Sequence, residues 1–289
     1  MDANLMQMAL QLSMQDMFSG SWFSNALMNK VWTEMMRSSV NGIIRTTGGP
    51  DLLGAALGGR LRGDAAMLRQ ASSNVSEAQS MMNMAADAVG NIASQLKEAH
   101  KLAGEFLDAT DGMHPGDTDY QALYEVFESL YEAIGNNINS MIKNTKYNGI
   151  ALLDGSAWNN DTRLSIIPNA DDEPAAASVH IQAGDSGFPL TFSNMDLNFA
   201  NITTEHPLYD NPQVLTDLNS LQSSAQTLAN LYAGRAGSLQ SQGTSLQSQA
   251  KILDEAVTQR AKTPVPVSPE YLLLNLILRD SGSLVSRKG

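Results

Sequence analysis

Residues 75–106 read VSEAQSMMNMAADAVGNIASQLKEAHKLAGEF, and this stretch decides the fold. Small and apolar side chains recur in it every seven residues, which is the spacing of a coiled-coil seam on an α-helix. One row consists of Val75, Met82, Val89, Leu96 and Ala103, and the other of Ala78, Ala85, Ile92, Ala99 and Phe106. The pattern predicts a helix over about residues 64–108, roughly 65 Å long at 1.5 Å per residue, with helical partners along it.

Two further helices are predicted after this one. A turn cluster at 111–117 separates the first helix from a second over 118–144, and such a short connection implies an antiparallel pair. Helical periodicity returns over 212–262 and ends at the proline-rich residues that follow. One heptad row of this third helix is apolar, but its second row holds Arg235 and two glutamines, so that face is expected to meet water or a polar partner.

The helices are interrupted by a region with strand-like alternation at 163–167, 178–181 and 190–192. The predicted fold is therefore mainly α, a long antiparallel coiled-coil-like helical rod with a small β-hairpin insertion. The side chains expected to pack in the rod core are Val75, Ala78, Met82, Ala85, Val89, Ile92, Leu96, Phe106, Leu123, Phe127, Leu130, Ile134, Leu218, Leu221, Leu228, Leu239, Leu246 and Leu253.

Composition excludes several classes of function. The 289 residues carry a net charge of -12, which disfavours binding to nucleic acid or to anionic lipid because phosphates would be repelled. With 0 Cys there are no disulfides or thiolate metal sites, and the four His residues lack metal-ligand spacing. No usual signal peptide is visible, and the longest apolar stretch, 272–278, is far shorter than the ~20 residues that cross a bilayer. The sequence predicts no cofactor and no metal.

One stretch, Gly184–Pro189, resembles the surroundings of the nucleophile in trypsin-like serine proteases. Catalysis by Ser186 would need a histidine base and a carboxylate to orient it. The four histidines lie on or beside the predicted helices, on the preceding strand and in a loop, and no two-barrel architecture is available. We therefore interpret the stretch as a hairpin turn and expect the protein not to be an enzyme.

The methionine-rich first 45 residues have two interpretations. They hold eight of the 15 methionines together with Trp22, Phe23 and Trp32. Methionine fills irregular gaps in cores and is also common on surfaces that adapt to partners. The segment is either an ordinary core helix or a docking segment.

Three motifs resemble bacterial flagellins. Residues 70–78 (QASSNVSEA), followed by the heptad helix, are similar to the amino-terminal region of that family. Residues 144–155 (NTKYNGIALLDG) are the more specific match, and in flagellins they mark the turn from the second rod helix into the β hairpins. The glycine-containing approach at 41–47 resembles the flagellin linker. The motif residues are Asn144, Thr145, Tyr147, Asn148, Gly149, Leu152 and Leu153.

The resemblance implies a structural subunit of the extracellular flagellar filament, exported unfolded by the flagellar type III apparatus. It implies a D0/D1 organisation, with an amino-terminal D0-like segment at 1–45, the first half of the D1 rod at 46–155, β hairpins at 156–210, the carboxyl-terminal rod helix at 211–262 and a D0-like tail at 263–289. The expected polymerisation residues at the ends are Leu5, Met8, Leu12, Trp22, Phe23, Trp32, Leu272, Leu273, Leu276 and Leu278.

The expected partners are further copies of the chain, and by resemblance an export chaperone and hook-associated or cap proteins. Residues 96–103 match the region that a vertebrate Toll-like receptor reads in flagellins, but the arginines typical there are missing, so we do not expect strong receptor activation. The alternatives are a hook–filament junction protein, which usually has a different sequence at 151–155, and a flagellin-like adhesin or effector not used for swimming.

Overall fold

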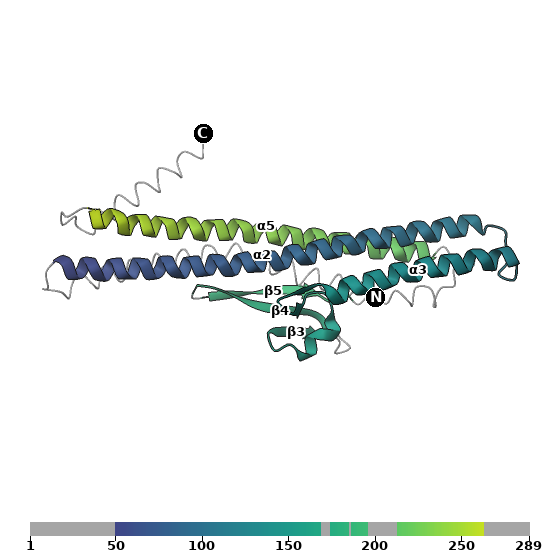
Figure 1. Ribbon diagram of the computed structural model, residues 1–289, viewed down its shortest axis with the longest axis horizontal. Helices are drawn as coiled ribbons and strands as arrows, with labels where there is room; N and C mark the ends of the chain where they lie inside the picture. Colours follow the sequence, from purple (N-terminus) through teal and green to yellow (C-terminus); the bar gives the residue numbers. More distant parts are fainter. Residues whose placement is uncertain (1–49, 169–173, 185, 196–212, 263–289) are drawn as a thin grey trace, which may run out of the picture. The chain divides into compact units, whose positions relative to one another are not determined.

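The computed structural model describes residues 50–168, 174–184, 186–195 and 213–262. The elements in chain order are α2 (Pro50–Ala109), α3 (Thr118–Asn144), β1 (Lys146–Tyr147), β2 (Ile150–Ala151), the 3-10 helix η1 (Gly155–Asn160), β3 (Leu164–Pro168), β4 (Pro174–Ala183), β5 (Ser186–Ser193) and α5 (Gln213–Lys262). The predicted fold class, mainly α with long helices and a small antiparallel β region, is confirmed (Figure 1). The chain divides into two compact units, and the described residues 73–243 fall in unit 1 while 50–72 and 244–262 fall in unit 2.

Helix α2 buries a continuous stripe of small and apolar side chains in unit 1. Its members repeat at heptad spacing, so they stay on one side of the helix. All ten are at most 5% exposed: Val75, Ala78, Met82, Ala85, Val89, Ile92, Leu96, Ala99, Ala103 and Phe106. A helix with such a stripe is stable in water only when other elements cover it.

The first residue of α2 is Pro50, although the sequence predicted a start near Asp64. Proline is favoured in the first turn of a helix, where its missing N–H would have had no partner anyway. Four glycines lie between positions 54 and 63. They lower the helix propensity of this stretch but do not end the helix.

Unit 2 holds the first part of α2 and the last part of α5. Within it, Ala65 and Leu68 of α2 are buried, as are Leu246 and Ala250 of α5. The guanidinium of Arg69 forms an ion pair with the carboxylate of Asp254, so a charged contact at the surface accompanies these buried residues.

Helix α3 packs on α2 through aromatic rings. The ring of Phe106 lies 5.7 Å from Tyr120, 6.0 Å from Tyr124 and 4.7 Å from Phe127, measured between ring centroids. Edge and tilted contacts at these distances are favourable beyond the area that the rings bury. The turn between the helices is closed by the backbone N–H of His114, which donates to the Asp117 carboxylate at 2.8 Å.

The predicted core row of α3 is wrong at two positions. Leu123 is 38% exposed and Leu130 is 49% exposed, and Ile134 is only half-buried. The buried side of the helix contains Tyr120, Phe127, Tyr131, Gly135, Ile138 and Ile142 instead. This row has equally good helical spacing, and it buries the large aromatic rings rather than the leucines.

The β region contains a two-stranded hairpin, β1–β2, and a three-stranded antiparallel sheet in the order β3–β4–β5. Strand β4 is central, with Val179 opposite Leu164 on one side and opposite Leu190 on the other. Its residues Val179, Ile181 and Ala183 are buried at alternate positions, as a sheet with one covered face requires.

Helix α5 covers the outer edge of β5 with two polar side chains. The backbone N–H of Ser193 donates to the hydroxyl of Tyr232 at 2.8 Å, and Nη1 of Arg235 donates to the carbonyl of Thr191 at 3.2 Å. Both helix residues are buried, at 0% and 8% exposed. The polar partner of this heptad position is therefore the edge of the sheet itself, because a buried cation needs hydrogen-bond acceptors. Two leucines of the same heptad row differ, because Leu228 is buried and Leu221 is half-buried.

Replacing Tyr232 by Phe tests this contact. Burial raises the pKa of Tyr232, so its hydroxyl remains protonated under ordinary conditions. Without the hydroxyl, the buried Ser193 N–H loses its acceptor, and we expect a loss of about 1–3 kcal/mol in the free energy of unfolding. The midpoint of urea unfolding measures the change. Tyr124→Phe, on a less buried tyrosine, is the control, and equal midpoints for the two variants would contradict the assignment.

Candidate functional site

The tightest chain reversal lies where α3 ends and the β region begins. Strands β1 and β2 pair with Lys146 opposite Ala151 and Tyr147 opposite Ile150, which leaves a two-residue turn. Its residues, Asn148 and Gly149, have φ angles of 48° and 79°. Two positive φ values are typical of a type I′ turn, which Asn-Gly adopts at the least cost.

Some of the motif residues around this turn are buried in the core, and others lie at the surface. Leu152 and Leu153 are 0% exposed, so they hold the hairpin in the core. Thr145 is buried, and its hydroxyl donates to the carbonyl of Met141 at 2.6 Å. Asn144 is exposed, and its Nδ2 donates to Ser140 Oγ at 3.0 Å. The motif therefore has a structural role here, in ending α3 and reversing the chain.

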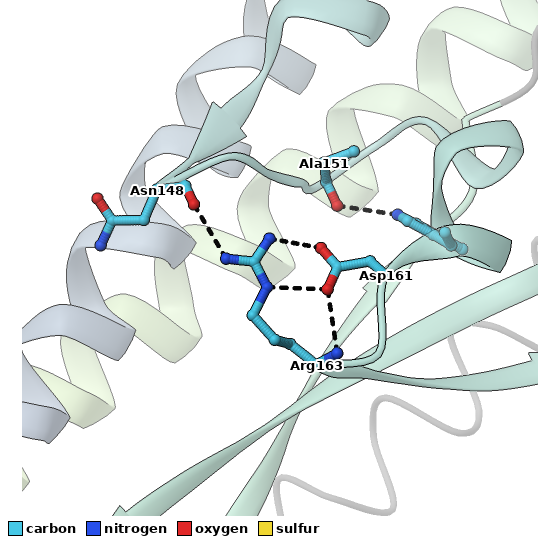
Figure 2. A network of polar contacts seen from close by, with 5 residues as sticks. Asn148, Ala151, Asp161 and Arg163 are labelled. Carbon is cyan, nitrogen blue, oxygen red and sulfur yellow. Dashed lines mark hydrogen bonds and ion pairs between the residues drawn. The ribbon is translucent and has the colours of Figure 1, made fainter.

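A short polar network fixes the outer side of the turn (Figure 2). The guanidinium of Arg163 donates to both carboxylate oxygens of Asp161, at 2.8 and 2.6 Å, and to the backbone carbonyl of Asn148 at 3.1 Å. The backbone N–H of Arg163 also donates to Asp161 at 3.0 Å. These hydrogen bonds hold the pKa of the Asp161 carboxyl below its ordinary value.

The inner side of the junction is held by Asn194, just after β5. Its Oδ1 accepts the N–H of Gly155 at 2.9 Å, and its Nδ2 donates to the carbonyl of Pro174 at 3.0 Å. A Cβ at Gly155 would overlap this side chain. The indole of Trp158, 1% exposed, donates to the carbonyl of Ala151 at 2.8 Å. The hairpin and the sheet are thus one body within unit 1.

Sequence reasoning missed Trp158 and Asn194, and for Arg235 it predicted water or a polar partner without naming the partner. Trp158 could have been noticed because it is the one tryptophan of three that lies outside the first 45 residues. Arg235 occupies a heptad core position, where a charged residue points to a buried polar partner. Asn194 had no signal in the sequence, because its partners Gly155 and Pro174 are far from it along the chain.

The structure also shows whether His180 can act as a base for Ser186. This residue pairs with Ala183, while His180 pairs with Pro189. Because neighbouring residues of a strand face opposite sides of a sheet, Ser186 and His180 are on opposite faces, and this histidine is not a base for the serine. His100 lies on α2 and His114 in the turn after it, while His206 lies outside the described residues.

Other chemistry is also not seen in the described part of the chain. No group of three or more His, Asp or Glu side chains there is placed to hold a metal ion. None of the described helices combines the length and the apolar character that crossing a membrane requires. The residues predicted for polymerisation, Leu5, Met8, Leu12, Trp22, Phe23, Trp32, Leu272, Leu273, Leu276 and Leu278, lie outside the described residues.

Replacing Arg163 by Gln tests the polar network through the pKa of Asp161. The folded-state pKa of this carboxyl is lowered by its hydrogen bonds to Arg163, so the contact stabilises the fold at neutral pH and is lost as the pH falls through that pKa. We expect Arg163→Gln to raise the pKa of Asp161 toward its ordinary value of about 3.8, as measured by an NMR titration of the side-chain carboxyl. An unchanged titration would show that the contact is not formed in solution.

Two glycine substitutions test the packing of the junction. Gly155→Ala places a methyl group against Asn194, and we expect a loss of about 1–3 kcal/mol in the free energy of unfolding. Gly90→Ala, at a helix position with open space around a Cβ, should be neutral or stabilising by up to about 1 kcal/mol. Urea unfolding of both variants measures the difference, and equal effects would argue against the close approach at Gly155.

The comparison with protein families agrees with this geometry. Residues 46–157 match the bacterial flagellin N-terminal helical region, which is less than half of the chain but includes α2, α3 and the hairpin junction. A comparison with curated proteins gives no match. The flagellin family is structural rather than enzymatic, self-assembles into polymers and forms extracellular filaments. The matched region and the mainly α fold together support similarity to bacterial flagellins over residues 46–157.

Proposed function

We propose that this chain is a subunit that assembles with copies of itself into the bacterial flagellar filament and supports motility. The observation that carries the proposal is the match over residues 46–157, which ends just after the hairpin where the motif residues reverse the chain. The burial pattern supports a structural role, because the motif residues either pack in the core or close the turn.

The proposal assigns assembly to the two chain ends. In this scheme 1–45 and 263–289 are D0-like segments, 46–155 and 211–262 form the D1 rod, and 156–210 form the β-hairpin region. The apolar residues of the ends, Trp22 and Leu272 among them, are the proposed polymerisation contacts. Such contacts between different surfaces of neighbouring copies do not close into a ring, so they extend a helical filament.

Export as an unfolded chain is part of the same proposal. A polypeptide that is threaded through a type III apparatus must unfold before transit and fold again outside the cell. With 0 Cys, no disulfide can trap an intermediate on this route. An export chaperone and hook-associated or cap proteins are the further proposed partners, and the proposed location is the extracellular filament.

Polymerisation of the purified chain tests the proposal. We expect the full-length protein to form filaments, seen by electron microscopy after seeding with salt or filament fragments. A chain lacking 1–40 and 263–289 should keep its helical circular dichroism but form no filaments, because the apolar end segments provide the contacts.

Two results would contradict the filament proposal. If the full-length chain stays a monodisperse monomer under seeding, the junction protein or the non-swimming adhesin or effector becomes the better explanation. If the shortened chain forms filaments as readily as the full-length chain, the ends are not the polymerisation segments.

A further inference from the structure

Helix α3 exposes a stripe of large apolar side chains. Leu123, Val126 and Leu130 are 38%, 61% and 49% exposed, and their spacing of three and four residues places them side by side along the helix. Isolated exposed apolar side chains are common on protein surfaces. A row of three on one side of a helix is instead typical of a surface that binds another molecule. We name these three residues the apolar wall.

A second stripe on α3 is acidic. Glu125, Glu128 and Glu132 are exposed at the same helical spacing and form what we name the acidic wall. Between the two walls lie the small exposed residues Ala122, Ser129 and Ala133. The charge is one-sided, because residues 102–142 contain eight acidic side chains and no Lys or Arg. The face between the walls suits a helix with one apolar and one basic edge.

The first part of α2, in unit 2, has a face of this kind. Gly59, Gly63 and Ala66 are exposed along it, and a Cβ at either glycine would meet no atom within 4 Å. Met67, 41% exposed, lies on one edge of this small-residue face with the exposed Arg60 two turns before it, and the exposed Arg62 lies on the other edge. Small residues at the centre let another helix approach closely, as alternating large and small residues do in helix packing.

We propose that the α3 face between the two walls binds the start of α2 from a second copy of this chain. When the helices run antiparallel, Met67 meets the apolar wall and Arg62 meets the acidic wall. A parallel arrangement would place Arg62 against the leucines and Met67 against the glutamates. Both surfaces are exposed and carry complementary charges, so the occupant that we assign to the α3 face is the start of α2 from a second copy. The inference rests on the proposed function and deepens it by naming a lateral contact between subunits.

Engineered cysteines test the contact directly, because the natural chain has 0 Cys and every disulfide is then diagnostic. Full-length Val126→Cys and Met67→Cys chains are mixed, assembled and oxidised mildly. We expect a cross-linked dimer from the mixture and little from either variant alone. Met84→Cys replaces Met67→Cys as the matched control, because Met84 is also an exposed methionine of α2, at 39%, but lies roughly 25 Å further along the helix.

Surface substitutions provide a second readout. Leu123→Gln, Val126→Gln and Leu130→Gln together should leave the circular dichroism and the unfolding midpoint unchanged, because these side chains are exposed. They should raise the critical concentration for assembly by at least about tenfold. Glu128→Arg and Arg62→Glu should each raise it at low salt, and the chain with both changes should return toward the wild-type value, because the double change restores opposite charges.

The outcomes separate this inference from the proposed function. A wild-type chain that does not assemble overturns the proposed function. A wild-type chain that assembles, but shows no cross-link between positions 126 and 67 and is unaffected by the three glutamine substitutions, overturns the α3–α2 contact alone. Equal cross-linking through position 84 also overturns it, since the contact would then lack the proposed register.

Discussion

The buried stripe of α2 is the constraint on which the rest of unit 1 depends. Alanines alternate in it with larger side chains such as Met82 and Leu96, so any element that covers it must come close at some positions and make room at others. Phe106 ends the stripe at the turn and is met by the rings of α3. Burying each large apolar side chain contributes about 1.5–3 kcal/mol to the stability of the fold. An isolated helix, whose side chains stay exposed to water, gains none of this stabilisation.

The β region is also held at its borders by hydrogen bonds between helix side chains and its backbone. Asn74 of α2 donates to the carbonyl of Gln182 on β4 at 2.7 Å, and Tyr232 and Arg235 of α5 occupy the edge of β5. A free sheet edge can pair with other chains, and a helix that covers the edge prevents such pairing. Tyr232 and Arg235 thus cover the backbone groups at the edge of β5 and also fix the position of the sheet against α5.

The fold could be predicted from the sequence wherever a sequence pattern was compatible with a single local structure. The α2 heptads could be recognised because both rows are unbroken, and the Asn-Gly turn because few residues tolerate two positive φ angles. On α3, by contrast, two rows of helical spacing compete, and periodicity alone does not choose between Leu123 and Tyr120. The choice depends on which side chains fit against Phe106, and that partner lies on another helix. Asn194 was missed, and the partner of Arg235 was not identified, for the same reason, since these partners are fixed by tertiary structure.

The exposed apolar face of α3 favours association in the proposed assembly, whereas the net negative charge of the chain opposes it. A net charge of -12 keeps dissolved copies apart, which favours a soluble monomer. Repulsion between exposed charges falls off within about 8 Å at physiological salt, so it acts mainly at close approach. In the proposed contact, a local basic group meets the acidic surface of α3, and that group is Arg62 beside the small-residue face of α2. Under this proposal, charge sets which faces meet, while the apolar residues beside them supply most of the energy of the contact.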